Sequence, residues 1–348
     1  MPALVDAMPE VPPYDTDLIA THTTAASTSV AHWVALHHGI PVERCHLIRR
    51  GLNDNYDLRA RGGARYVVRV YSIRPRGGFN IDFEAALLEH LHDRGAGVAP
   101  LVKCHNGQTH AVLRFPEGTR ALTLFQYVDG AVPDTLEEFE LTGCTLAHIH
   151  AAARDYAGPP SRYILDGHHL VGRTLQYLEA YPDLDPAVLD AYRALAGRLL
   201  EELTALEPGL SRVVCHGDTH GFNNHIHTGP DGSKAAAFFD FDDAGPGFLA
   251  YDLSVLPWSY MVRKTIREPD DTLRERWTHY LRGYRCAGGE ISEDDIKALP
   301  MFVQLRHLWN MGEAVGRLHH WGTSMAPADW LKKQIDGFEA WKGLDLTA

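Results

Sequence analysis

The sequence predicts an α+β fold in two lobes, a small β-rich N-terminal lobe followed by a larger, mainly helical C-terminal lobe. Strand-like segments separated by turn signals fill much of residues 46–133. Helix-periodic segments dominate from residue 135 onward. A chain of 348 residues is also too long for one small core. We therefore expect a tail and helix in residues 1–40, a first lobe in 41–129 and a second lobe in 130–348, with a hinge near 126–130.

One helix is expected to lead into the first lobe. Residues 15–40 can form it, and Gly39 and Pro41 would end it. The apolar residues near its end are Val30, Trp33, Val34 and Leu36. A hairpin or meander follows in residues 46–72, because apolar and polar residues alternate around turn signals at 51–55 and 61–64.

The rest of the first lobe is predicted as a helix, a second hairpin and a last strand. Residues 81–95 have apolar side chains at helical spacing and a terminal glycine. Residues 101–115 are expected to form the hairpin, turning at "HNGQ" in 105–108. The last strand lies in residues 121–133 and runs into a Gly/Pro break.

The second lobe is predicted to be mostly helical, with a small hairpin inside it. "RVVC" at 212–215 has the composition of a strand. Residues 224–247 contain a short hairpin that turns at 229–234 and returns through Ala236–Phe239. The helix-periodic segments are 135–153, 172–206 with a break near Pro182, and the chain from 250, including a long helix in 299–322.

Composition excludes some classes of protein and favours a cytoplasmic one. A formal net charge of −12 disfavours a nucleic-acid partner, because phosphate backbones require a basic surface. No apolar run approaches the roughly 18 residues of a membrane span, and the acidic, proline-broken N-terminus lacks the pattern of a signal peptide. The five cysteines are scattered without a C-x-x-C pair, which indicates reduced thiols in the cytoplasm.

The most informative stretch is "VVCHGDTHGFNNHI", residues 213–226, where polar side chains follow directly on a strand. A carboxylate in a tight loop, here Asp218, can orient or deprotonate a hydroxyl. The amide oxygen of Asn223 and the strand-end carboxylate of Asp240 are hard oxygen ligands of the kind that suits Mg²⁺. The hairpin should bring Asp240 back beside the loop, and strand alternation would point Asp242 the same way. Asn224 replaces Asn223 if the register of the loop differs.

The order of these elements resembles the aminoglycoside phosphotransferase and choline kinase family, which has a protein-kinase-like fold. The resemblance covers roughly residues 45–320. The family pattern is H-G-D-x-x-x-x-N, followed by D-[FLW]-[DEG] on the next strand. The matching residues are His216, Gly217, Asp218, Asn223 and Asp240, and Asp252 in "YDLS" matches an aspartate found a dozen residues later in many members.

The resemblance implies an ATP-dependent phosphotransferase that transfers the γ-phosphate to a hydroxyl of a small molecule. Members of the family act on aminoglycosides, amino alcohols, amino acids and sugars. Asp218 would be the catalytic residue, and Asn223 and Asp240 would hold Mg²⁺. His216 and Asp252 are expected to brace the loop and to do no chemistry.

In the first lobe the resemblance implies a nucleotide site. The loop from Gly51 to Asn55 would cover the phosphates. Arg69 stands where the family usually has a lysine, which is a departure, although an arginine fork can also hold phosphate oxygens. Glu84, or less favourably Glu89, would pair with Arg69. The backbone of residues 126–128, with Gln126 and Val128, would contact adenine.

The acceptor site is expected in the helical lobe. Asp243 and Glu313 could line it, and an acidic lining would suit a cationic acceptor. Trp258, Trp309 and Trp321 could stack on a sugar or an ammonium group, although burial in the core is expected for at least two of them. The sequence leaves open the acceptor, the oligomeric state and the choice between ATP and GTP.

Three other functions stay open at the level of the sequence. One is a bacterial stress-response type of Ser/Thr protein kinase, and another is a non-catalytic nucleotide-binding module, which Arg69 makes conceivable. The third is a zinc-dependent hydrolase, because imidazole is a common zinc ligand. The histidines that raise it are His216, His220, His225 and His227.

Overall fold

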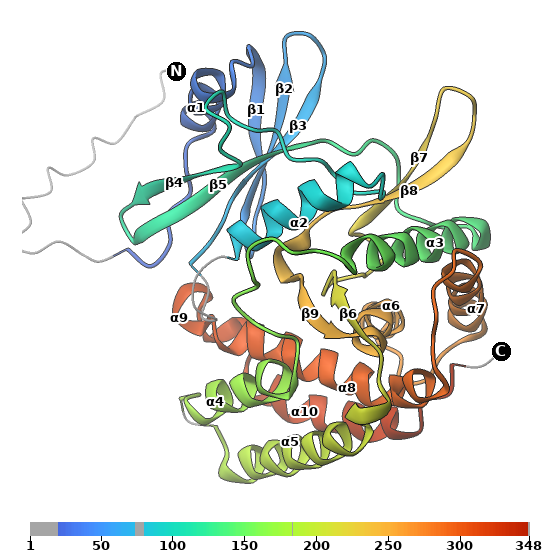
Figure 1. The fold of residues 1–348 in the computed structure, drawn as a ribbon. Coiled ribbons are helices and arrows are strands. Elements are labelled where there is room, and N and C mark those ends of the chain that lie inside the picture. Colours follow the sequence, from blue (N-terminus) through green and yellow to red (C-terminus); the bar gives the residue numbers. More distant parts are fainter. Residues whose placement is uncertain (1–19, 74–79, 183, 347–348) are drawn as a thin grey trace, which may run out of the picture.

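A computed structural model of the chain describes residues 20–73, 80–182 and 184–346, and Figure 1 shows a β-rich lobe above a helical one. The first lobe holds a five-stranded antiparallel sheet in the order β1-β2-β3-β5-β4. Its strands are β1 (Val42–Arg50), β2 (Asp54–Ala60), β3 (Arg65–Val70), β4 (His110–Phe115) and β5 (Gly118–Gln126). The expected meander with turns at 51–55 and 61–64 is therefore confirmed.

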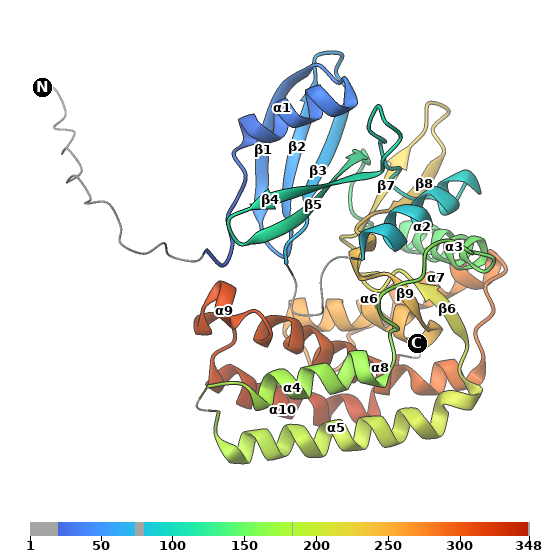
Figure 2. The same ribbon diagram turned by 60° about the vertical axis from the view of Figure 1, so that its left-hand side comes forward.

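Helix α1 (Ser27–His38) covers one face of this sheet, as Figure 2 shows. Val30 and Val34 of α1 join a core with buried strand residues such as Tyr56. Two expectations for this helix were wrong: it begins at Ser27, and Leu36 is 65% exposed. Residues 22–25 instead run along the sheet, where side chains of the first lobe bond their backbone; residues 15–19 lie outside the described part.

The predicted hairpin in residues 101–115 was also wrong. Residues 104–108 do form a turn, but no strand precedes it, and β4 pairs with β5 through a turn at residues 116–117. Leu101 makes only an isolated bridge to Phe125. The observed hairpin therefore joins the second half of the predicted hairpin, residues 110–115, to the predicted last strand.

Helix α2 (Ile81–Asp93) belongs to the first lobe in sequence but packs into the core of the second. Its buried residues Phe83, Leu87 and Leu91 share one cluster with helices of the second lobe. In Figure 1 it lies between the sheet and α3 (Leu136–Ala153). Glu84 on α2 is therefore held in a fixed relation to both lobes.

The linker between the lobes is pinned to the second lobe. Ala131 and Ile226 exchange both backbone hydrogen bonds. Gly130 has φ +120°, and a Cβ there would lie 2.2 Å from the carbonyl oxygen of Ile226, so only glycine fits.

Helices dominate the second lobe, as predicted. Helix α3 begins with a capping box formed by Thr135 and Glu138, and Asp185 caps α5 ahead of Pro186. The principal helices are α3, α4 (Arg173–Glu179), α5 (Pro186–Leu206), α6 (Leu249–Lys264), α7 (Asp271–Cys286), α8 (Glu293–Val315), α9 (Leu318–Trp321) and α10 (Ala328–Ala340). Among the helices of the described chain, none combines the length and apolar character that a membrane crossing needs. All five cysteines are free thiols.

Two short strand pairs interrupt the helices and carry the polar motif. Strand β6 (Arg212–Cys215) pairs with β9 (Gly245–Phe248). Strand β7 (Asn224–Thr228) pairs with β8 (Lys234–Phe238) in the predicted hairpin. The loop that follows β6 lies against the chain that follows β8, where His216 contacts Phe239.

The core of this lobe contains a histidine that burial keeps neutral. His307 lies in α8 with 3% of its surface exposed. Its Nδ1 accepts from the indole N–H of Trp258 at 3.1 Å, and its Nε2 lies 3.1 Å from Oε1 of Gln334. Burial lowers the pKa of His307 to about 4.

We expect this histidine to make the fold sensitive to acid. Because its folded-state pKa lies below the unfolded value, its contribution is full above the unfolded pKa and declines as the pH falls toward about 4. Between pH 7 and pH 5 the free energy of unfolding should fall by roughly 2 kcal/mol from this group. Urea unfolding of wild type and His307→Gln at both pH values measures this fall. The free energy of unfolding should fall less between pH 7 and pH 5 in the variant than in wild type. Equal losses would contradict the assignment.

Candidate active site

The loop from His216 to Asn223 carries the polar motif, and a buried aspartate of α6 holds its start. The two carboxylate oxygens of Asp252 accept from the backbone N–H of His216 at 2.9 Å and of Gly217 at 2.8 Å. Gly217 has φ +84°, and a Cβ there would lie 2.2 Å from the backbone oxygen of Asp243. Asp252 therefore braces the loop, as expected from the sequence.

His216 connects this loop to the chain after β8. Its Nε2 donates to the carbonyl oxygen of Phe239 at 3.0 Å, and its Nδ1 accepts from the N–H of Asp218 at 3.2 Å. The N–H of Phe239 in turn donates to the carbonyl oxygen of Asn223 at 2.9 Å. Asp240 therefore follows directly on a residue that is bonded to both ends of the loop.

The carboxylate of Asp218 has a charged partner on one oxygen and an amide on the other. Arg306 of α8 donates to Oδ1 at 2.5 Å, and Asn223 Nδ2 donates to Oδ2 at 2.8 Å. His220 Nε2 lies 3.3 Å from Oδ2. Burial alone would raise the pKa of Asp218, but the charges of Arg306 and His220 outweigh it and hold this pKa well below its usual range.

The structure distinguishes the two adjacent asparagines. Asn223 donates to both the backbone and the carboxylate of Asp218, so its Oδ1 is left to accept a cation. Asn224 turns the other way and donates to Thr142 of α3 at 3.0 Å. The register that pairs Asn223 with Asp218 is the one in the fold.

Asp240 sits at the end of β8 in a left-handed backbone conformation with φ +69°. Only one other non-glycine residue of the described chain, Thr265, has a positive φ. Such a conformation costs on the order of 1–3 kcal/mol and is concentrated at functional sites. Here it turns the carboxylate toward the first lobe, where Oδ1 lies 3.0 Å from Arg69.

Arg69 joins the two lobes through two carboxylates. One terminal nitrogen lies 3.1 Å from Oε1 of Glu84, and the other pairs with Asp240. Tyr71 donates to the second oxygen of Glu84 at 2.8 Å. Glu89 instead pairs with Lys103, so Glu84 is the partner that the structure selects. Burial raises the pKa of Glu84, which makes its charged form depend on Arg69.

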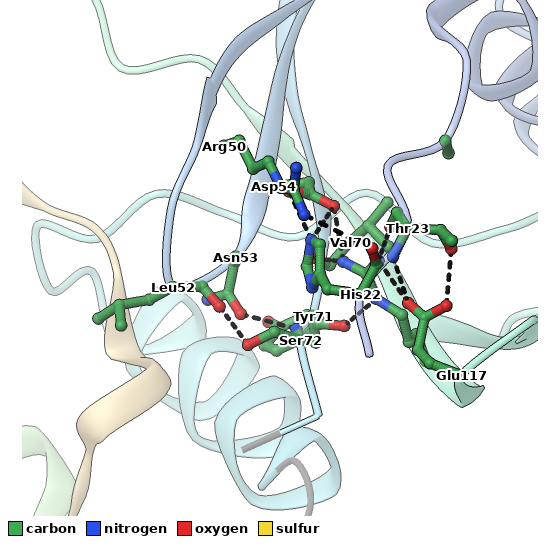
Figure 3. Close-up of polar contacts among 12 residues, drawn as sticks. His22, Thr23, Arg50, Leu52, Asn53, Asp54, Val70, Tyr71, Ser72 and Glu117 are labelled. Atoms are coloured by element: carbon green, nitrogen blue, oxygen red, sulfur yellow. Dashed lines mark hydrogen bonds and ion pairs between the residues drawn. The ribbon is translucent and has the colours of Figure 1, made fainter. Parts of the chain in front are cut away.

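The loop between β1 and β2 reaches across to the second lobe through Asn53. Its Oδ1 accepts from the N–H of Ser72 at 3.1 Å, and its Nδ2 donates to Asp242 at 2.8 Å. Figure 3 shows Asn53 and Leu52 facing Ser72. Gly51 lies at the start of this loop, and Asn55 lies directly opposite Arg69 in the register of β2 and β3.

Asp242 therefore does not follow the prediction made from strand alternation. Residues 241–243 form a short 3₁₀ turn, because the left-handed residue Asp240 ends the strand. The carboxylate of Asp242 faces Asn53 of the first lobe. Alternation applies only while the chain stays extended.

A buried ion-pair network fixes the base of the same loop (Figure 3). Asp54 accepts from Arg120 at 2.8 Å, and both side chains are fully buried. Arg120 also pairs with Glu117, and Glu117 accepts from the backbone and hydroxyl of Thr23. His22 also contacts both strands that flank the loop, because its carbonyl oxygen accepts from Arg50 of β1 and its ring lies 3.4 Å from Asp54 of β2.

The residues present fit a magnesium-bound nucleotide. Oδ1 of Asn223 and the carboxylate of Asp240 are hard oxygen ligands of the kind that suits Mg²⁺, whereas the carboxylate of Asp242 already accepts from Asn53. Nε of Arg69 is buried and has no hydrogen-bond partner among the described residues, so a phosphate oxygen could satisfy it.

A model of the phosphotransferase enzyme family matches residues 47–289, which is more than half of the chain. The chain belongs to this family. A protein of Deinococcus radiodurans, described as uncharacterized, is 34% identical over 324 residues, or 93% of this chain and 92% of that protein. The matched residues include the loop of Asp218 and Asn223, Asp240, and the pair of Arg69 and Glu84.

Solved structures establish the kinase-like fold of this family member. The amicoumacin kinase hAmiN superposes with a TM-score of 0.71 at 20% identity, covering 92% of this chain and 96% of that chain. A microcompartment-associated aminopropanol kinase gives 0.66 at 21% identity, covering 92% and 100%.

The linker residues expected to contact adenine have some backbone groups engaged already. The N–H of Gln126 donates to the carbonyl oxygen of Pro100 at 2.9 Å. The carbonyl oxygen of Val128 lies 2.8 Å from Nδ1 of His225. A nucleotide base bonding at these groups would have to share or displace those partners.

The two acidic residues that were expected to line an acceptor site are compensated by arginines. Glu313 lies 2.6 Å from Arg317 and 3.6 Å from Arg173. Asp243 is buried beside Gly217, within the electrostatic range of Arg306. The site is therefore less acidic than the sequence suggested.

The tryptophans divide as expected. Trp258 and Trp309 are 6% and 4% exposed. Both rings stack on Arg306, at 4.7 and 4.4 Å from its guanidinium carbon. Trp321 lies on α9, near Arg317. Two of the three tryptophans thus belong to the core and brace an arginine.

Three of the four histidines that suggested zinc have separate partners. His216 bonds Phe239, His220 faces Asp218, and His225 faces Val128. Within the described residues, no group of three or more His, Cys, Asp or Glu side chains is arranged to hold a metal.

Sequence reasoning did not single out Arg306 and Asn53. Arg306 is an isolated charge within the apolar stretch "FVQLRHLW", and a buried charge needs a partner. That signal could have marked it, although its partner lies 88 residues away in the chain. Asn53 lay inside the loop that was already noted.

Proposed function

We propose that the chain is an ATP- and Mg²⁺-dependent phosphotransferase that acts on a hydroxyl of a small molecule. One observation carries the proposal: backbone bonds through Phe239 place Asp240 beside the loop of Asp218 and Asn223. From the other lobe, Arg69 meets the same Asp240. A positioned carboxylate, a metal-binding pair and a phosphate-binding cation are what phosphoryl transfer requires.

Each side chain has a distinct task in this proposal. Asp218 accepts a hydrogen bond from the acceptor hydroxyl and holds it in line with the γ-phosphorus. Asn223 and Asp240 hold Mg²⁺, which neutralises charge on the phosphate oxygens when bound. Arg69, set by Glu84, binds phosphate oxygens, while Gly51, Asn55, Gln126 and Val128 lie along the nucleotide.

The proposed reaction is an in-line displacement at the γ-phosphorus. The acceptor oxygen forms a bond to the γ-phosphorus as the bond from that phosphorus to the β–γ bridging oxygen breaks, and ADP leaves. The proton of the hydroxyl passes to Asp218 and then to solvent. Because its neighbours favour the charged form of Asp218, we infer that it orients the hydroxyl and takes the proton late.

A screen for ADP release tests the proposal. The wild-type chain is incubated with ATP, Mg²⁺ and a panel of hydroxylated amines, amino acids and sugars, with ADP measured by a coupled assay. We expect at least one compound to raise ADP release above the rate with water, and chelation of Mg²⁺ to abolish it. Two results would contradict a small-molecule kinase. One is phosphorylation of protein substrates with no transfer to any small compound, and the other is ATP binding without turnover.

A further inference from the structure

Arg306 touches the reacting loop at two points from a helix far away in the chain. One terminal nitrogen donates to the carbonyl oxygen of Gly217 at 2.9 Å, and the other donates to Oδ1 of Asp218. The first nitrogen also donates to the hydroxyl of Tyr251 at 3.1 Å. A single planar group therefore holds the backbone and the side chain of adjacent residues.

The position of this guanidinium is itself fixed by packing. The side chain of Arg306 is 3% exposed and lies near the rings of Trp258 and Trp309. The indole N–H of Trp258 bonds His307, and that of Trp309 bonds His169 at 3.1 Å. Because both rings are held in turn, the arginine has little rotamer freedom left.

Arg306 is more deeply buried than the carboxylate that it holds. Its side chain is 3% exposed, whereas that of Asp218 is 19% exposed. The hydrogen bonds of its guanidinium go to Gly217, Tyr251 and Asp218. Of these three partners, only Asp218 is a group that the proposed function assigns to the reaction.

We propose that Arg306 is the positioning residue of this active site, through which helix α8 sets the direction of the Asp218 carboxylate. The inference rests on the proposed function, because it takes Asp218 as the reacting group. A lysine could not replace Arg306, because one ammonium group lacks the fork that reaches Gly217 and Asp218 together. The helix that belongs to the acceptor lobe would thus also align the group that meets the acceptor hydroxyl.

Arg306→Lys tests the proposal, with Arg198→Lys as its control. Arg198 also bonds α8, at Gln304, but lies on the far helix α5. With the acceptor found in the screen, we expect kcat of Arg306→Lys to fall about 10²-fold, because small misplacements of reacting groups have effects of that size. The dissociation constant of MgATP, measured by calorimetry, should stay within about twofold. Arg198→Lys should match wild type in both.

A second variant removes one anchor of the guanidinium without removing its charge. Tyr251→Phe loses the hydrogen bond from Arg306, and we expect kcat to fall about fivefold with unchanged MgATP binding. This variant keeps the proposal testable if Arg306→Lys does not fold. A kcat within about twofold of wild type in every folded variant, or MgATP affinity lost in proportion to kcat, would overturn the positioning role.

Amide hydrogen exchange separates this inference from the proposed function. Exchange in residues 216–223 should be faster in Arg306→Lys than in wild type, and unchanged in Arg198→Lys, whether or not an acceptor is found. If wild type transfers phosphate to no tested compound and the exchange pattern is as expected, the proposed function fails, while the positioning of the loop by Arg306 is supported. If wild type is active and neither kcat nor exchange changes in Arg306→Lys, the positioning role of Arg306 is overturned, while the proposed function stands.

Discussion

Asp218→Asn is expected to lower phosphoryl transfer by about 10³-fold, within the range for losing a positioned acid–base group. Asparagine keeps the shape of the side chain and one acceptor oxygen, so the loop should hold its course. It loses the charge that Arg306 and His220 surround and the ability to take a proton. Steady-state kinetics should show kcat lowered by about 10³-fold, and calorimetry should show MgATP binding within about threefold of wild type.

The control for Asp218→Asn is the same substitution at Asp231. That residue lies exposed at the turn of the β7–β8 hairpin and bonds only nearby Ser233. It should leave turnover unchanged. Because Asp218→Asn leaves the buried Arg306 without its counter-charge, a lower melting temperature is also expected. Full turnover in a folded Asp218→Asn protein would remove Asp218 from the reaction.

Asp240→Asn should abolish the dependence of ATP binding on Mg²⁺. Asparagine tolerates the left-handed backbone at this position, so the change removes charge with little added strain. It also removes the partner of one nitrogen of Arg69, which lies 3.0 Å away. We expect turnover to fall by about 10²-fold or more, because the metal loses its charged ligand.

Titration of ATP binding at several Mg²⁺ concentrations measures this effect. In wild type, affinity for ATP should rise with Mg²⁺, whereas in Asp240→Asn it should stay flat. Asp231→Asn again provides the unchanged reference. A variant that binds ATP in the Mg²⁺-dependent manner of wild type would show that another residue holds the metal.

Local signals in the sequence predicted what depends on neighbours in the chain. The turn signals of the meander and the hairpin after Asn224 act over a few residues, and they were confirmed in the fold. The spacing that favours Asn223 agrees with its hydrogen bond to Asp218, and the metal-binding role of Asn223 stays a prediction. The pairing of Arg69 with Glu84 spans 15 residues and followed from the resemblance.

The errors concern features that tertiary packing decides. The turn signal at residues 105–108 is real, but β4 pairs with β5, which follows it through the turn at residues 116–117. Asp242 left the expected strand because Asp240 turns the backbone. The charge of Glu313 is offset by Arg317, whose i,i+4 spacing could be read in the sequence, and by Arg173, which only the fold brings near.

The central claim is that Asp218, Asn223 and Asp240 serve one magnesium-bound nucleotide. A crystal structure with Mg²⁺ and a non-hydrolysable ATP analogue tests it most directly. We expect the metal to be coordinated by Asn223 Oδ1 and Asp240, with the γ-phosphate beside Asp218 and Arg69 on the phosphate oxygens. A nucleotide bound elsewhere, or a γ-phosphate turned away from Asp218, would contradict it.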